Sequence, residues 1–115
     1  MRDNKVVIYH HPNGEIKSFL TPEEIFPPRV EYFKRPLDKD SEETLRSMGV
    51  IGAQVVKEIM AIPGVMEIRI KPKEIRMKKE VSFSWEDIEG KVLEILIRAI
   101  RRKQIRPASH LDAGP

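Results

Sequence analysis

The chain has 115 residues, of which 40% are hydrophobic and 34% charged, and its formal net charge is +3. This composition is typical of one globular domain, and no run approaches the roughly 18 apolar residues of a membrane helix. The chain contains no cysteine, which excludes disulfides, a thiol nucleophile, cysteine-ligated zinc and any metal cluster held by its own thiolates. Because the apolar part of the first ten residues is too short for a signal peptide, we expect a cytoplasmic protein.

The N-terminal third predicts a hairpin followed by a short edge strand. Residues 5–10 are β-branched and aromatic, as in a strand, and residues 11–14 (His-Pro-Asn-Gly) predict a turn, since Asn-Gly tolerates positive φ. Polar and apolar side chains alternate over 16–19, so a second strand should pair with the first. Four prolines between residues 21 and 40 disfavour a helix there, and residues 30–33 predict an edge strand between them.

The middle of the chain predicts a helix that begins after an acidic segment. Asp40 is the expected N-cap, with Glu43 three positions later completing a capping box. Apolar residues then recur at helical spacing, but Gly49 and Gly52 interrupt them. The pattern therefore predicts a helix over 52–61, with the preceding turns bending away and a stop at Pro63.

A second hairpin is predicted around the Pro-Lys turn at 72–73, because apolar and charged side chains alternate on both sides of it. The apolar face of this hairpin should cover the core, and its charged face should meet solvent. We also expect its outer edge to offer unpaired backbone groups. The apolar set is Met66, Ile68, Ile70, Ile75 and Met77, and the charged set includes Arg69, Lys71, Arg76 and Lys78.

The last predicted element is a helix that begins after Ser84 and has acidic residues in its first turn. A broad apolar stripe over residues 88–100 suits packing on a sheet, and the basic residues 101–103 suit its C-terminal end. Trp85 is expected to anchor the core beside the helix start. After Pro107 the chain is small and polar, and residues 104–115 predict a disordered tail.

Together these elements predict one α+β domain over residues 1–103. Its expected architecture is a mainly antiparallel sheet of four or five strands with two helices on one face, in the order β-β-(β)-α-β-β-α.

Three segments in this order resemble the N-terminal domain of the Nfu/NifU-like scaffold proteins of iron–sulfur cluster assembly. They are Pro12-Asn13 with the strand ending in Lys17-Ser18-Phe19, Ile59-Met60-Ala61-Ile62-Pro63-Gly64-Val65, and the strand at 75–78 followed by Trp85-x-x-Ile88-x-x-x-Val92. The resemblance spans about residues 5–100. It departs from the family in its start, His10-His11-Pro12-Asn13, and in the segment 20–40.

The resemblance implies a non-catalytic interaction or accessory domain that acts through protein partners in cluster assembly or delivery. The family's full-length scaffolds carry their cluster on a separate Cys-x-x-Cys domain, and this chain has no cysteine. We therefore expect no cofactor on this chain. Because no apolar run is long enough to span a membrane, we also expect no membrane partner.

Other candidate sites have plainer interpretations. His10 and His11 are adjacent on a strand and should point to opposite faces, so they are unsuited to sharing one metal ion even with His110 as a third ligand. The acidic pairs suit helix starts or a polar loop better than acid–base chemistry; they are Glu23-Glu24, Glu42-Glu43 and Glu86-Asp87. No triad order and no phosphate loop is present, so we expect no enzyme.

The basic residues of the second hairpin are the candidate partner-binding site, namely Arg69, Lys71, Arg76 and Lys78. One interpretation is a solvated strand face, and another is a docking surface for an acidic protein, to which Arg98, Arg101, Arg102, Lys103 and Arg106 would add charge. The alternative function is a basic nucleic-acid-binding module, although no aromatic residues interleave with the basic ones for stacking. A small-molecule sensor or enzyme subunit is the third hypothesis.

Overall fold

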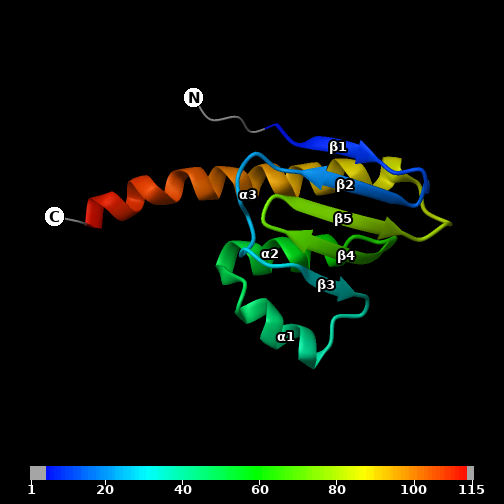
Figure 1. The fold of residues 1–115 in the computed structure, drawn as a ribbon, viewed down its shortest axis with the longest axis horizontal. Coiled ribbons are helices and arrows are strands. Elements are labelled where there is room, and N and C mark those ends of the chain that lie inside the picture. The colour runs from blue at the N-terminus through cyan, green and yellow to red at the C-terminus, as the bar shows by residue number, and fades with distance from the viewer. Residues whose placement is uncertain (1–4, 114–115) are drawn as a thin grey trace.

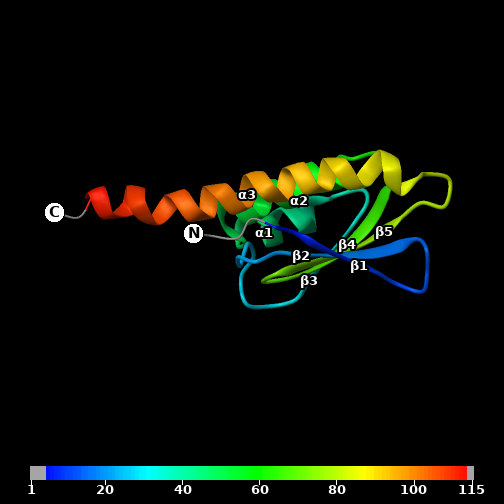
Figure 2. The ribbon, with the colours of Figure 1, turned by 90° about the horizontal axis from the view of Figure 1, so that it is seen from above.

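The computed structural model describes the backbone of residues 5–113 and the side chains of residues 5–104. It contains one antiparallel sheet of five strands in the spatial order β1-β2-β5-β4-β3, together with three helices. Helices α2 and α3 lie on one face of the sheet, and α1 packs against α2 beside the β3 edge (Figures 1 and 2). The elements are β1 (Val7–His10), β2 (Ile16–Leu20), β3 (Glu31–Lys34), α1 (Lys39–Arg46), α2 (Gly49–Met60), β4 (Val65–Lys71), β5 (Glu74–Lys79) and α3 (Trp85–Ala113).

The predicted α+β class and element order are confirmed, with one correction. The sequence predicts a single helix before the second hairpin, whereas the structure has two, α1 and α2. They separate at Ser47–Met48, and Gly49 follows at a φ of +85°. A non-glycine residue adopts this positive φ only at a cost, so glycine here suits the break between the two helices.

The first helix begins two residues earlier than predicted. Its N-cap is Asp38, not Asp40: the Asp38 carboxylate accepts from the Ser41 backbone N–H at 3.0 Å, and the Ser41 hydroxyl completes the capping box. These bonds stabilise the ionised carboxylate and hold the pKa of Asp38 below its usual value, with the Ser41 backbone N–H as the largest cause.

The core lies between the sheet and the helices and is built mainly from aliphatic side chains. Ile68, Ile75 and Met77 point from the second hairpin towards the helices and are almost completely buried, as the alternation predicts. Met66 departs from this pattern because a β-bulge shifts the register between Val65 and Glu67. The extra residue turns the Met66 side chain outwards, so its predicted place on the apolar face is wrong.

The second hairpin occupies the middle of the sheet, which corrects the expectation of an unpaired outer edge. Strand β5 pairs with β2, and β4 pairs with β3, so both sides of the hairpin are hydrogen-bonded. The two edges of the sheet are β1 and β3 instead. The charged residues of the hairpin consequently lie at the centre of a continuous surface.

The helical backbone of α3 continues to Ala113, beyond the predicted end at Lys103. Figures 1 and 2 both show that its last turns extend past the sheet, away from the other elements. The backbone of residues 104–113 is helical, even though Pro107 removes one backbone donor from the helix. That this segment lies outside the folded domain stays a prediction.

Candidate partner-binding face

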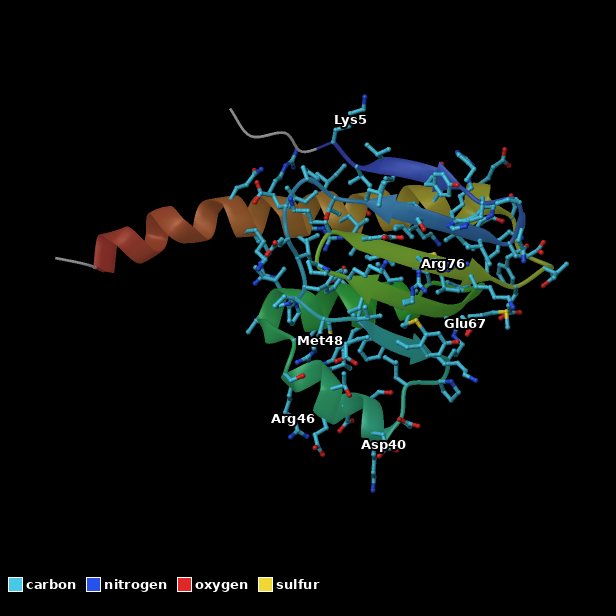
Figure 3. The ribbon with its side chains drawn as sticks, viewed as in Figure 1. Lys5, Asp40, Arg46, Met48, Glu67 and Arg76 are labelled. Carbon is cyan, nitrogen blue, oxygen red and sulfur yellow. The ribbon has the colours of Figure 1, made fainter. Side chains whose placement is uncertain are left out.

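The helices cover one face of the sheet, and the opposite face, which we call the open face, carries the charged residues of the second hairpin. Alternation along β4 and β5 directs Arg69 and Arg76 to this side, because Ile68, Ile70 and Ile75 are buried on the helix side. The open face is turned towards the reader in Figure 3, where Arg76 lies near the middle of the sheet.

A single row of side chains crosses all five strands of the open face. The strand register pairs Tyr9 with Ser18, Ser18 with Arg76, Arg76 with Arg69, and Arg69 with Tyr32. Residues directly opposite in an antiparallel pair share a face, with Cβ atoms about 4.5–5.5 Å apart. The row therefore places two arginine residues side by side in the middle of the sheet and one tyrosine at each edge.

We call this row the central row. In the two neighbouring rows, residues of opposite charge face each other across β4 and β5. Lys71 lies opposite Glu74 on one side, and Lys78 lies opposite Glu67 on the other. Arg69 and Arg76 alone in the hairpin oppose like charges, an arrangement that destabilises a sheet. Among the described residues neither arginine forms an ion pair, and the buried Nε of Arg69 has no hydrogen-bond partner.

A shallow hollow of about 230 Å³ lies over this part of the sheet. Its size suits one or two side chains better than a cofactor, since drug-sized ligands occupy about 300–1,000 Å³. Both basic and apolar groups border it, so it can hold an anionic group beside a small apolar one. Its lining residues are Ile16, Tyr32, Glu67, Ile68, Arg69, Arg76, Met77 and Lys78.

The structure brings together three of the four predicted site residues. Arg69, Arg76 and Lys78 border the hollow, whereas Lys71 lies next to the hairpin turn and does not. The basic residues of α3 do not join them: Arg98 donates to Glu58 at 3.1 Å and Arg102 to Gln54 at 2.7 Å, both contacts to α2 on the helix side. The side chain of Arg106 lies outside the described residues.

Sequence reasoning missed the remaining members of the row. Tyr9, Ser18 and Tyr32 come from strands that are distant from the hairpin in sequence. Their alternation within β1, β2 and β3 indicated which residues share a side of each strand, but the order of the strands was needed to align them.

The two strand histidines have different surroundings. His10 is exposed, whereas the His11 ring lies 3.0 Å from the Ser18 hydroxyl and packs edge-on against Tyr9. Among the described residues no group of three or more histidine or acidic side chains is placed to hold a metal ion. The side chain of His110 lies outside them, and the absence of a metal site stays a prediction.

Trp85 packs against the core beside the start of α3, as predicted, and its ring centroid lies 6.5 Å from that of the buried Phe19. Its indole is half-buried at the rim of the core, where Nε1 donates to the Gly14 carbonyl at 2.7 Å. Lys17 Nζ lies 5.0 Å from the ring centroid and pairs with Glu89. Trp85 therefore fastens the first hairpin turn to the start of α3 through a hydrogen bond and a cation–π contact.

Several residues of the predicted acidic pairs lie at helix starts, as expected. Glu42 lies in the first turn of α1, and Glu86 and Asp87 lie in the first turn of α3, where the helix dipole favours negative charge. Glu86 N–H also donates to the Ser84 hydroxyl at 3.1 Å, so Ser84 caps the helix as predicted.

No helix in the described part of the chain is both long enough and apolar enough to cross a membrane.

The fold and the open face define a small α+β protein with an open antiparallel sheet whose uncovered side is rich in basic residues. Among solved structures the chain is similar to a NifU-like protein from Saccharomyces cerevisiae, with a TM-score of 0.62 and 17% sequence identity over 82% of this chain and 76% of that one. It is also similar to protein SAV1430 from Staphylococcus aureus, with a TM-score of 0.60 and 20% identity over 79% of this chain and 96% of that one.

At these identities the likeness establishes a NifU-like fold. A solution structure of the same staphylococcal protein gives a TM-score of 0.55 at 18% identity, over 78% of this chain and 86% of that one. No family model matches the chain, and no curated protein matches it.

Proposed function

We propose that this chain is a non-catalytic accessory domain of iron–sulfur cluster assembly or delivery, similar to the N-terminal domain of the Nfu/NifU-like scaffold proteins. The observation that carries the proposal is the fold shared with the yeast NifU-like protein. The three sequence segments that resemble the family support it independently, because they lie in the family's order along the same fold.

One of these segments has a structural explanation in this fold. Gly64, in the turn between α2 and β4, has a φ of +97°, and Phe83 packs directly over its Cα. Arg35 donates to the carbonyls of Met60 and Ile62 at 3.0 and 2.9 Å and so satisfies the end of α2. The motif at residues 59–65 thus fixes a fold element and not a reacting group.

The domain acts by binding partners on the open face. Arg69, Arg76 and Lys78 present their charges together there, and Lys71 extends the basic surface towards the hairpin turn. A basic surface of this kind steers an acidic partner and fixes its orientation. We infer a cytoplasmic protein without enzymatic activity, which supplies a docking surface and leaves cluster chemistry to its partners.

The test is capture of identified iron–sulfur assembly proteins from host lysate by the tagged wild type and by the Arg69→Glu/Arg76→Glu/Lys78→Glu variant. We expect the wild type to retain such proteins, identified by mass spectrometry, and the variant to lose them. The matched control is Lys57→Glu/Lys91→Glu/Arg101→Glu, which reverses three exposed charges on the helices. Circular dichroism confirms folding of all three proteins.

Undiminished capture by the folded open-face variant would remove this face from the proposal. Anaerobic reconstitution provides a second check: because the chain has no thiolate, we expect no cluster on the purified monomer. A stable cluster absorption band would contradict that expectation.

The alternative, a nucleic-acid-binding module, gains one observation from the structure: Tyr9 and Tyr32 flank the arginines on the open face. However, the tyrosines lie on the two edge strands, four strand spacings or about 19 Å apart, so they cannot stack successive bases. Retention of RNA or DNA with a steep salt dependence, without capture of assembly proteins, would favour this alternative.

A further inference from the structure

We propose that Arg69 and Arg76 form a carboxylate-binding site, which anchors an acidic side chain from an extended segment of a partner protein. The inference rests on the proposed function for the identity of the partner, but the site itself follows from the geometry of the open face. It names the group that is recognised and the two residues that recognise it.

The central row of the open face carries an unbalanced positive charge. The neighbouring pairs Lys71–Glu74 and Lys78–Glu67 place opposite charges face to face, whereas Arg69 opposes Arg76. No acidic side chain of the described residues pairs with either arginine. The missing negative charge is therefore one that a ligand can bring.

The two arginines also have hydrogen-bond donors to spare. A guanidinium presents five N–H donors in a planar fork that matches a carboxylate. Arg69 Nε is buried without a partner, and the two arginines begin from Cβ atoms only about 5 Å apart. One carboxylate between them can accept from both, and this arrangement also relieves the repulsion between the two positive charges.

The size and lining of the hollow suit an acidic side chain beside an apolar one. Its volume of about 230 Å³ accommodates one glutamate side chain and part of a neighbouring apolar one. Ile16 and Tyr32 provide apolar contact area around the arginines, which favours a peptide with mixed acidic and apolar residues. Glu67 in the same lining opposes a long run of phosphates, so a protein segment suits the hollow better than a nucleic-acid backbone.

The test is an NMR titration with a defined probe, the blocked peptide acetyl-Gly-Leu-Glu-Leu-Gly-amide, and with the same peptide carrying Gln in place of Glu. We expect the Glu peptide to shift the Arg69 and Arg76 Nε–H signals and the amides of the hollow, and the Gln peptide to bind at least tenfold more weakly. Charge-assisted hydrogen bonds of about 1.5–3 kcal/mol correspond to a change of this size.

Arg69→Gln and Arg76→Gln should each weaken binding of the Glu peptide about tenfold or more. The matched control is Lys73→Gln, which removes an exposed positive charge from the turn of the same hairpin, outside the hollow. We expect it to change the dissociation constant less than threefold, because an exposed charge outside the contact contributes little.

A melting experiment separates binding from a structural role. Because Arg69 and Arg76 oppose each other, replacing either should leave the melting temperature unchanged or raise it. A loss of many degrees in both variants would show that the arginines support the fold. The proposal would also be overturned by equal binding of the Glu and Gln peptides, or by equal weakening in Lys73→Gln. No binding at millimolar peptide, or tighter, competing binding of a dT12 oligonucleotide, would overturn it as well.

The two proposals fail separately. If the Glu peptide binds the arginine pair but the wild type captures no iron–sulfur assembly protein from lysate, the carboxylate site stands and the proposed function is wrong. If capture of those proteins persists in the Arg69→Gln/Arg76→Gln variant, the proposed function stands and the carboxylate site is wrong.

Discussion

The turn between α2 and β4 gives the sharpest prediction about stability. Gly64 combines two constraints: its φ is +97°, and a Cβ built there would lie 2.6 Å from Phe83 Cγ and 2.9 Å from Phe83 Cβ. Real Cβ atoms do not approach this closely, so Gly64→Ala must both strain the backbone and displace a packed aromatic ring.

The two costs have separate magnitudes. A left-handed conformation costs an L-residue roughly 1–2 kcal/mol, and overpacking a core costs about 1–3 kcal/mol more. Gly64→Ala should therefore lower the free energy of unfolding by about 2–5 kcal/mol, or roughly 10–20 °C in melting temperature for a domain of this size.

Two other glycines provide matched controls. Gly49 has a φ of +85° but nothing within 4 Å of an added Cβ, so Gly49→Ala should show the backbone cost alone, about 1–2 kcal/mol. Gly14 also has open space and no positive φ, so Gly14→Ala should stay within about 0.5 kcal/mol of the wild type.

The assay is urea unfolding followed by circular dichroism, with a double-mutant cycle through Phe83→Ala. Removing the ring should cut the cost of Gly64→Ala towards that of Gly49→Ala, so the double variant should lose less stability than the sum of the two single losses. The reasoning is refuted if Gly64→Ala costs no more than Gly49→Ala in the wild-type background, or if Phe83→Ala leaves its cost unchanged.

Four further predictions concern the stability of particular elements. Ile68→Ala should cost about 2–5 kcal/mol, because its side chain is 1% exposed in the inner strand β4. Val81→Ala, at 80% exposure, should cost less than about 0.5 kcal/mol, and similar values for both variants would mean that the buried face is misassigned. Trp85→Phe should lose about 0.5–1.5 kcal/mol with the hydrogen bond to the Gly14 carbonyl, and unchanged stability would show that this bond contributes nothing. Deletion of residues 108–115 should leave the melting temperature almost unchanged, because the end of α3 extends past the sheet; a drop of many degrees would show that it docks. The pKa of Asp38 is lowered in the folded state, so the carboxylate stabilises α1 above the usual pKa of 3.8, and this stabilisation is lost as the pH falls from 3.8 through the folded pKa. Asp38→Asn should remove this pH dependence in an NMR titration of the α1 amides. An identical pH profile in the variant would contradict the prediction.

The local elements follow from the sequence because their causes are local. Alternation predicted both hairpins, the Asn-Gly and Pro-Lys turns predicted where they reverse, and the apolar stripe predicted α3. The two-residue turn at 72–73 even determines that Arg69 faces Arg76, because pairing proceeds outwards from Lys71 and Glu74. What this reasoning misplaced was also local: the N-cap moved to Asp38, since Asp38 and Asp40 are equally good caps in sequence and only the path of the backbone selects one.

The central position of the second hairpin was decided by the tertiary structure. Nothing in its own residues indicates that β2 pairs with β5 and β3 with β4, because these pairings join segments far apart in the chain. They depend on which apolar faces the helices can bury together, and not on any local preference. The same long-range pairing aligns Tyr9, Ser18 and Tyr32 with the two arginines. The sequence by itself thus determined the charged face, and the sheet order made it one continuous surface.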